Sequence, residues 1–442
     1  MSIKNFYEIL KTSEFKDIEV ADIINDELTR QRSTLCLIPS ENYISREVAI
    51  ALSSPLNNKY SEGYPHKWKE NTVISQNGKY YQGQKNAIAI EELAMKRGLE
   101  LFTQNPDLYH INVQSLSGAP ANLAVLNAFL NKGDTFMGLA LDFGGHLTHG
   151  HKVNITSKYY NAVQYSLNNN GELDFDEIEK LALLHKPKLI FCGATAYPLK
   201  IDFSKFSEIA KKVGAILAAD ISHICGLCIA NEHPHPFPYA DVITTTTHKI
   251  LRGPRAGIII SKKEYGQQID KSIFPGIQGG PHMSAIAAMA VAFKEAMQPE
   301  YRDYIKQVIK NAKVLSEELQ KLGFNIVSKR TENHLILLDV VNNGHLSVEN
   351  GSWLAERLEL AGIITNKNTI PGDKKPWIPS GIRIGTPAAT TLGMKEDEMK
   401  LIANLIKKAT ENSHSDDTLK NISLEIKTLL NLFIEKNNNL LI

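Results

Sequence analysis

The sequence has 442 residues, of which 43% are hydrophobic and 22% are charged. These shares are close to the globular average and exclude a disordered, collagen-like or disulfide-stapled chain. Basic residues number 49 and acidic residues 48, so the formal net charge of +1 creates no overall field that would attract nucleic acid or an anionic membrane.

The N-terminal part contains one helical stretch and then a polar arm, residues 39–84, without a regular period. From there to residue 280, helical periods such as 87–102 and 175–185 alternate with short apolar runs. Short buried strands that alternate with helices are typical of an α/β fold with a mostly parallel central sheet. The runs that we predict to be strands are 134–141, 188–193, 215–219, 241–245 and 257–261.

The pattern changes in the last third of the chain. Residues 285–322 read as long helix, interrupted at Pro299, and the alternation at 333–341 predicts a strand. A helix near 353–361 and a strand near 381–384 complete a smaller α+β domain. The order of elements therefore predicts a larger α/β domain followed by a smaller α+β domain.

Leucine and isoleucine recur at helical spacing in the tail, which predicts an appended amphipathic helix. We therefore expect four parts in the chain. They are an N-terminal helix and arm (1–85), a large α/β domain (86–290), a linking helix with the small α+β domain (291–412), and a C-terminal helical extension (413–442).

The run DVITTTTHKILRGPRAG, residues 241–257, carries the strongest chemical signal. A strand runs into four threonines and then into His248 and Lys249. Hydroxyls can bind a phosphate, and a partly desolvated lysine is a better nucleophile because its pKa falls. This arrangement suits a Schiff base to pyridoxal phosphate, whereas a lone Thr-Lys pair would read as a surface lysine at a strand end.

Two further segments fit the same cofactor. Asp220 ends the apolar run GAILAAD, where a carboxylate could keep a pyridinium nitrogen protonated or could cap a helix. Ser117, Gly118 and Ala119 lie between a strand-like and a helix-like run. Their N–H groups would form a phosphate site at a helix N-terminus, although small residues also make ordinary turns.

Substrate-binding and proton-transfer groups are also suggested. Arg383 lies in the apolar strand SGIRIG, where it could bind a substrate carboxylate in a bidentate manner or form a structural ion pair. Tyr60, Glu62 and Tyr64 are clustered in NNKYSEGYP and could transfer protons or form an exposed loop.

We predict no metal site and no membrane span. The histidines of HLTHGH lack the H-E-x-x-H pattern, and Cys225 and Cys228 have no second cysteine pair. The N-terminus has no apolar signal-peptide region, and no apolar run is long enough to cross a bilayer. We therefore expect a cytoplasmic protein that binds neither nucleic acid nor membrane.

Taken together, these segments resemble the serine hydroxymethyltransferases, a family of fold-type I pyridoxal phosphate enzymes. The resemblance covers about residues 35–405. It implies reversible transfer of the hydroxymethyl group of serine to tetrahydrofolate, which gives glycine and 5,10-methylenetetrahydrofolate. The motifs occur in the order PSENYIS, NKYSEGYP, GGHLTHG, DISHICGL, TTTTHKILRGPR, FPGIQGGP, NKNTIP and SGIRIGTPA.

The resemblance implies which residues bind the cofactor. Lys249 would form the Schiff base, and Asp220 would face the pyridine nitrogen. His146 would stack on the ring, and Thr195 would meet its phenolic oxygen. The other positions implied for the cofactor, several of them around its phosphate, are His223, Thr246, Ser117, Gly118, Ala119, Tyr60, Gly279 and Gly280.

The resemblance also implies the substrate and folate contacts. Glu62 would be the main proton-transfer carboxylate, and Tyr81 and His248 would complete the catalytic set with Lys249. The substrate positions implied are Arg383, Ser40, Arg255, Glu62 and Tyr81, and the folate positions are Leu141, Gly145, His146, Leu147 and Asn368. In the family the arm crosses to the partner, which implies a homodimer, or a tetramer, with shared active sites.

One departure from the family is large. The family runs almost directly from EGYPG into RYYGG, whereas here residues 66–79 intervene, and we call this segment the insertion. Two alternatives stay open from the sequence. One is a related pyridoxal phosphate aldolase that cleaves threonine-like amino acids without folate, and the other is a catalytically silent interaction protein that works through the insertion and the tail.

Overall fold

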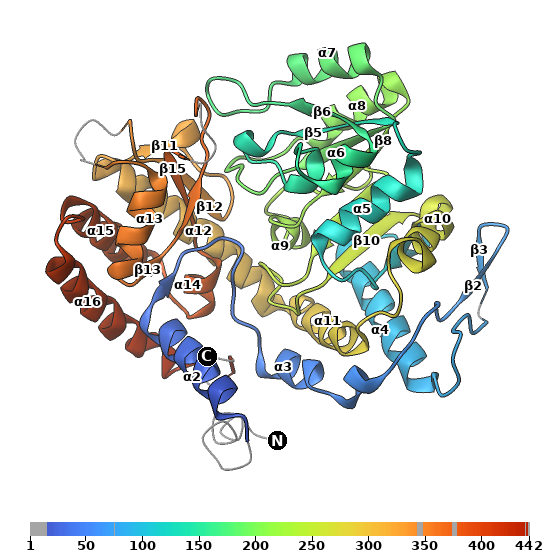
Figure 1. The fold of residues 1–442 in the computed structure, drawn as a ribbon, viewed down its shortest axis with the longest axis horizontal. Coiled ribbons are helices and arrows are strands. Elements are labelled where there is room, and N and C mark those ends of the chain that lie inside the picture. Colours follow the sequence, from blue (N-terminus) through green and yellow to red (C-terminus); the bar gives the residue numbers. More distant parts are fainter. Residues whose placement is uncertain (1–15, 75, 343–347, 374–377, 438, 441–442) are drawn as a thin grey trace.

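The computed structural model describes residues 16–74, 76–342, 348–373, 378–437 and 439–440. Figure 1 shows a larger α/β part and a smaller part, with the long helix α12 (Pro299–Lys321) running between them. The α/β fold class and the mostly parallel central sheet that the sequence predicts are confirmed.

The main sheet has seven strands in the order β4-β10-β9-β8-β7-β5-β6. Strands β6, β5, β7, β8 and β9 pair in parallel, and β10 is antiparallel to both β9 and β4. All five apolar runs that were predicted as strands lie in this sheet. The bounds are β4 (Tyr109–Asn112), β5 (Thr135–Leu139), β6 (Asn161–Tyr165), β7 (Leu189–Gly193), β8 (Ile216–Asp220), β9 (Val242–Thr246) and β10 (Gly257–Lys262).

Both faces of the main sheet are buried, which explains why its strands are continuously apolar. In β7, Leu189 and Phe191 pack into one apolar cluster, and Ile190 and Cys192 pack into another. Side chains of a strand alternate between faces, so the two clusters lie on opposite sides of the sheet. The helices of this part are α4 (Lys85–Phe102), α5 (Gly118–Phe129), α6 (Ile155–Tyr159), α7 (Phe175–His185), α8 (Phe203–Val213), α9 (Cys225–Ile229), α10 (Gly266–Lys271) and α11 (Met283–Ala296).

The smaller part contains an antiparallel sheet in the order β11-β12-β15-β14. Its own apolar cluster lies between this sheet and the helices that cover it. The strands are β11 (Asn325–Ile326), β12 (Leu335–Asp339), β14 (Asn366–Asn368) and β15 (Gly381–Gly385). The helices are α13 (Gly351–Leu360), α14 (Pro387–Thr391), α15 (Glu396–Glu411) and α16 (Asp416–Ile434).

The first described helix packs on the C-terminal part of the chain. Helix α2 (Ile18–Ser33) contacts α16, and strand β1 (Leu35–Cys36) pairs in parallel with β13 (Ile363–Ile364). Figure 1 shows α2 in blue beside the red C-terminal helix. The predicted amphipathic tail helix therefore exists and packs on α2, α13 and α15, while the four domain boundaries stay a prediction.

The polar arm is more regular than we expected from its sequence. It contains helix α3 (Arg46–Leu52) and a hairpin of β2 (Lys67–Lys69) and β3 (Thr72–Ile74). Ser45 caps α3 by accepting a hydrogen bond from the N–H of Val48, and Val48 packs against α11. Among the described helices, none is long and apolar enough to cross a membrane.

Candidate active site

The candidate residues gather where four neighbouring parallel strands end. In parallel strands the residues that follow the C-terminal ends lie at one edge of the sheet, which is where α/β proteins bind ligands. Strand β5 is followed by the loop with His146, and β7 by Thr195. Strand β8 ends at Asp220, and β9 is followed by Lys249. We call this group the strand-end pocket.

Asp220 is held as a buried anion. Its side chain is 7% exposed, and its oxygens accept hydrogen bonds from Asn122 Nδ2 at 2.8 Å, His149 Nε2 at 3.2 Å and Ser222 Oγ at 2.6 Å. Burial alone would raise the pKa of the carboxyl, but the hydrogen bond and charge of His149, the charge of His146 and the Ser222 hydrogen bond together keep that pKa well below its usual range. Asp220 therefore stays ionised at the edge of the sheet.

The network around Asp220 includes residues to which we assigned no role from the sequence. His149 stacks on Phe191, with ring centroids 5.0 Å apart, and Asn122 accepts a hydrogen bond from Thr244 Oγ1 at 2.6 Å. The HLTHGH motif was a signal for His149, but the partner of each histidine could not be read from spacing. His146 instead bonds Thr148 Oγ1 at 2.7 Å, and burial lowers its pKa to about 4, so it is neutral at pH 7.

Lys249 follows β9, the strand next to β8, and occupies a desolvated position. Burial lowers the pKa of its ammonium, Asp220 opposes that effect, and the charges of Arg383 and Arg255 reinforce it. Within the part of the chain that the structure describes, no hydrogen bond or ion pair engages the Lys249 side chain. The amine is therefore closer to its nucleophilic form than an ordinary surface lysine.

Helix α5 directs its N-terminus at the same place. Ser117 is the N-cap residue, and its side chain makes no capping hydrogen bond. At Gly118 a Cβ atom would lie 2.7 Å from Thr246 Cγ2, so only glycine lets the helix start this close to the end of β9. The first N–H groups of a helix have no intrahelical acceptors and bind anions such as phosphate.

Arg383 is a buried cation that has no acidic partner among the residues the structure describes. It lies in β15 at 9% exposure, with Nη1 2.5 Å from the carbonyl oxygen of Thr195 and Nε 3.1 Å from Asn366 Oδ1. Burial lowers the pKa of its guanidinium to about 10. None of the ion pairs among the described residues includes Arg383, so the structural ion pair that the sequence left open is not found there. A buried cation with only neutral partners favours an anionic ligand.

The remaining candidate residues are buried histidines and side chains that line a cleft. His223 Nδ1 lies 3.4 Å from Nε2 of His334, a second buried histidine that the sequence reasoning missed. Burial lowers the pKa of His223 well below its usual value and that of His334 to about 3. Ser40, His248 and Arg255 line a cleft of about 370 Å³, and Nδ1 of His248 is buried without a hydrogen-bond partner.

A second group of candidate residues is exposed. Tyr81 donates a hydrogen bond to Glu62 Oε2 at 2.9 Å, and Tyr60 donates one to Oε1 at 3.4 Å. Tyr60 is 58% exposed and Tyr81 42%, and Gly279 and Gly280 lie against Tyr60. The hydrogen bond to Glu62 raises the pKa of Tyr81. No hydrogen bond or ion pair among the described residues connects this group, the arm patch, with the strand-end pocket.

The positions implied for folate are only partly together. Leu141 and Leu147 lie in two short 3-10 helices after β5, and Gly145 accepts a hydrogen bond from Thr195 Oγ1 at 3.2 Å. Asn368 ends β14 in the smaller sheet, and its side chain bonds the neighbouring Thr369 carbonyl oxygen at 2.6 Å. No hydrogen bond in the described part links Asn368 with the loop after β5.

Comparison with known proteins identifies relatives over nearly the whole chain. A family profile described as "Serine hydroxymethyltransferase" matches residues 13–406. A protein named serine hydroxymethyltransferase from Desulfotalea psychrophila is 47% identical over 419 residues, which cover 95% of this chain and 94% of that protein. Proteins of the same name from Sorangium cellulosum and an Acidovorax species are 46% and 48% identical over 431 and 418 residues. These matches cover 97% and 94% of this chain, and 97% and 96% of the two relatives.

Proposed function

Because this chain belongs to the serine hydroxymethyltransferase family, we propose that the strand-end pocket and the arm patch are the two halves of one active site. The enzyme transfers the hydroxymethyl group of serine to tetrahydrofolate, reversibly, and forms glycine and 5,10-methylenetetrahydrofolate. Pyridoxal phosphate is its cofactor, and tetrahydrofolate is its co-substrate.

The residues of the strand-end pocket fit pyridoxal phosphate. The observation that carries the proposal is that the buried, ionised Asp220 and the desolvated amine of Lys249 lie at one edge of the sheet. Lys249 would hold the cofactor through a Schiff base, and Asp220 would keep the pyridine nitrogen protonated. When bound, the cofactor supplies an electron sink for breaking a bond at the amino-acid α-carbon. The other residues that would bind the cofactor are His146, Thr195, His223, Thr246, Ser117, Gly118 and Ala119.

Arg383 would bind the substrate carboxylate. Its guanidinium is buried and has only the Thr195 carbonyl and the Asn366 amide as partners. A carboxylate would neutralise this charge and accept two parallel hydrogen bonds, which fixes the orientation of the amino acid as well as its position. Ser40, His248 and Arg255, which line the adjacent cleft, would complete the substrate side.

Glu62 and Tyr81 would move the proton as the hydroxymethyl group leaves. The carboxylate accepts from two tyrosine hydroxyls, so a proton donor and an acceptor already face each other. Tyr81 is exposed and Glu62 is half-buried on one chain, and we propose that both are covered by the strand-end pocket of a second copy. Two identical composite sites then follow from twofold symmetry. Tyr60, Gly279 and Gly280 would reach the partner's cofactor phosphate.

A folate-dependence assay tests this function. Purified protein should be yellow with bound pyridoxal phosphate and should convert serine to glycine only when tetrahydrofolate is present. Equal cleavage without tetrahydrofolate, with threonine-like amino acids preferred, would indicate the aldolase instead. Protein that is folded but neither binds pyridoxal phosphate nor acts on serine would show that the pocket is silent. The folate contacts of Leu141, Gly145, Leu147 and Asn368 stay a prediction.

A further inference from the structure

The insertion adjoins two paired segments of the chain, and Glu62 lies in the first of them. Residues 60–64 and 78–81 run side by side, with hydrogen bonds from the Gly78 N–H to the Tyr64 carbonyl and from the Tyr80 N–H to the Glu62 carbonyl, each of 3.1 Å. Gly63 has φ of +85°, and a Cβ atom there would lie 2.3 Å from the Gly78 oxygen. We call these two segments the arm ribbon. Its backbone sets the position of the Glu62 side chain.

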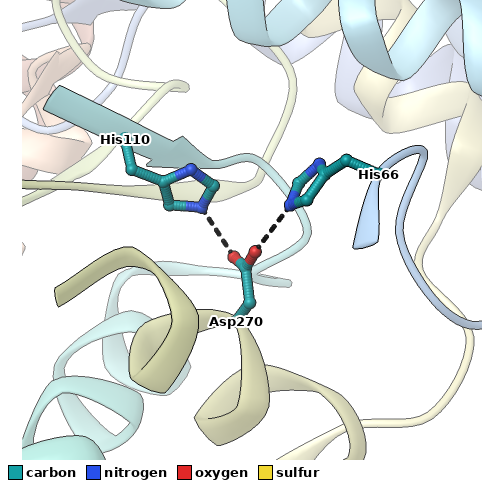
Figure 2. A group of neighbouring side chains, drawn as sticks. All are labelled: His66, His110 and Asp270. Carbon is teal, nitrogen blue, oxygen red and sulfur yellow. Dashed lines mark hydrogen bonds and ion pairs between the residues drawn. The ribbon is translucent and has the colours of Figure 1, made fainter. Parts of the chain in front are cut away.

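One end of the insertion is fastened to α10. Figure 2 shows His66 and His110 pointing at the buried carboxylate of Asp270, at 3.0 and 2.8 Å. Trp68 Nε1 and Asn112 Nδ2 also donate to this carboxylate, at 2.9 and 2.8 Å. The grouping of two histidines and an aspartate could suggest a metal site. However, indole and amide N–H groups are not metal ligands, and they already occupy the acceptor positions of the carboxylate, so the cluster is an anchor.

The other end of the insertion is fastened by Lys79. Its side chain is 0% exposed, and its ammonium donates to Glu91 Oε2 at 2.5 Å, to the Gly63 carbonyl at 2.8 Å and to the Ser61 carbonyl at 3.2 Å. An ammonium has three donors, so all three are used. Ser61 and Gly63 are the two residues on either side of Glu62.

The partner of Lys79 belongs to the rigid part of the molecule. Glu91 lies in the middle of α4 and is 0% exposed. Its other oxygen accepts from Gln114 Nε2 at 2.6 Å, and that amide also donates to the Gly63 carbonyl at 3.0 Å. The backbone on both sides of Glu62 is therefore tied through buried, charge-assisted hydrogen bonds to α4 and to the residues after β4.

From these contacts we propose that Lys79 is a positioning residue for Glu62, and that the insertion serves to hold it there. Glu62 itself is anchored only through its backbone and through two exposed tyrosines, so its carboxylate follows the ribbon. This proposal rests on the proposed role of Glu62 in proton transfer. A displacement of about 1 Å in a reacting group can cost roughly 100-fold in rate, which sets the scale of the expected effect.

The first experiment compares four variants of the full-length holoenzyme. Lys79→Met should lower kcat by roughly 10- to 100-fold while the KM for serine and the affinity for pyridoxal phosphate change little. Lys79→Arg keeps the charge and the donors and should retain more activity. Lys79→Met combined with Glu91→Gln leaves no unpaired buried charge, so it should recover stability without recovering kcat. Lys212→Met, which removes an exposed ion pair with Glu179, is the matched control and should be silent.

Full kcat in Lys79→Met would overturn the proposal. So would parallel recovery of stability and kcat in the double variant, because Lys79 would then be structural only.

The second experiment asks on which half of the site Lys79 acts. Mixed refolding of Lys79→Met with Lys249→Ala should restore about a quarter of the activity, because hybrid dimers would pair an intact arm with an intact pocket. Mixing Lys79→Met with Glu62→Gln should restore none, since both chains have a damaged arm. Activity that returns only in the mixture with Glu62→Gln would show that Lys79 acts on the strand-end pocket of its own chain. That result would refute the proposal. Wild-type protein without folate-dependent activity would instead refute the proposed function, whatever Lys79 does.

Discussion

The strand-end pocket and the arm patch differ in how far one chain completes them. Asp220 has three side-chain partners at 7% exposure, whereas Tyr60 is 58% exposed and contacts Glu62, the edge of the Tyr81 ring and two glycines. The pocket is built from strand ends, whose positions the sheet dictates. The patch is held through its backbone, and its side chains face outward. The comparison teaches that one chain buries and connects the side chains of the pocket by itself, whereas it leaves the tyrosines of the patch exposed.

The largest effect is expected in the pocket, from Lys249→Ala. Loss of the amine should remove the linkage that borohydride reduces and should lower activity by more than about 1,000-fold, with the fold retained. Peptide mapping after reduction of the wild-type protein should place the label on Lys249 alone. Label on another lysine would contradict the assignment, and Lys263→Ala, at an exposed lysine that follows β10 at the opposite edge of the sheet, provides the control.

The patch is tested by Glu62→Gln. Activity should fall by roughly 10²- to 10⁴-fold, the usual range for a general acid or base, while pyridoxal phosphate binding stays intact. Refolding this variant together with Lys249→Ala should recover about a quarter of wild-type activity, since half of the dimers would be hybrids with one intact site. Hybrid dimers seen by mass spectrometry but without activity would refute a shared site. Glu70→Gln in the hairpin is the matched control.

A smaller effect is expected from Arg383→Lys. Lysine keeps the charge but loses the planar fork, so the Kd for serine should rise by roughly 5- to 150-fold, equivalent to about 1–3 kcal/mol. The affinity for pyridoxal phosphate should change by less than about twofold. Titration with both ligands measures the difference, and Arg330→Lys on the surface is the control. Equal losses for serine and cofactor would show that Arg383 does not bind the substrate.

The smallest effect concerns the loss of folding stability at acid pH. This loss should depend on a buried histidine of the pocket and not on the patch. The pKa of His334 is about 3 in the folded chain and about 6.5 when unfolded, so the unfolded state binds more protons below pH 6.5. Stability should fall as the pH drops through 6.5 and continue to fall until about 3. Between pH 7.5 and 5.0, His334 should account for about 2 kcal/mol of the loss.

Urea unfolding of cofactor-free His334→Gln at both pH values measures that contribution. The variant should lose about 2 kcal/mol less than the wild type between the two conditions. His185→Gln, at an exposed histidine that ends α7, should lose as much as the wild type. Identical losses in all three proteins would show that His334 is protonated in the folded state.

The sequence predicted the pocket better than the patch for a physical reason. An apolar run that stops at a polar residue marks a strand end, so Asp220 and Lys249 could be found from a local pattern. His149 could not be assigned to Asp220, because that contact depends on how the loop after β5 folds back over the sheet. The buried pair of Lys79 and Glu91 was also missed, since Lys79 lies in a polar segment and Glu91 is a charged residue of a helix, and both positions read as solvent-exposed. Helix α3 was not predicted from the sequence, because Val48 is its one buried residue and a single residue makes no helical period.

The pairing of β1 with β13 also has a consequence for synthesis of the chain. Leu35 leaves the ribosome early, but its partner Ile363 leaves only after the whole main sheet, and α16, on which α2 packs, follows later still. During translation the apolar residues around β1 therefore stay without their native contacts until those partners are synthesised. Chaperones could bind them in that interval. Lys249 also emerges well before Arg383. With the roles proposed above, a nascent chain would form the cofactor-binding residues of the main sheet first, and Arg383 would be available for an amino acid only after the smaller sheet has emerged.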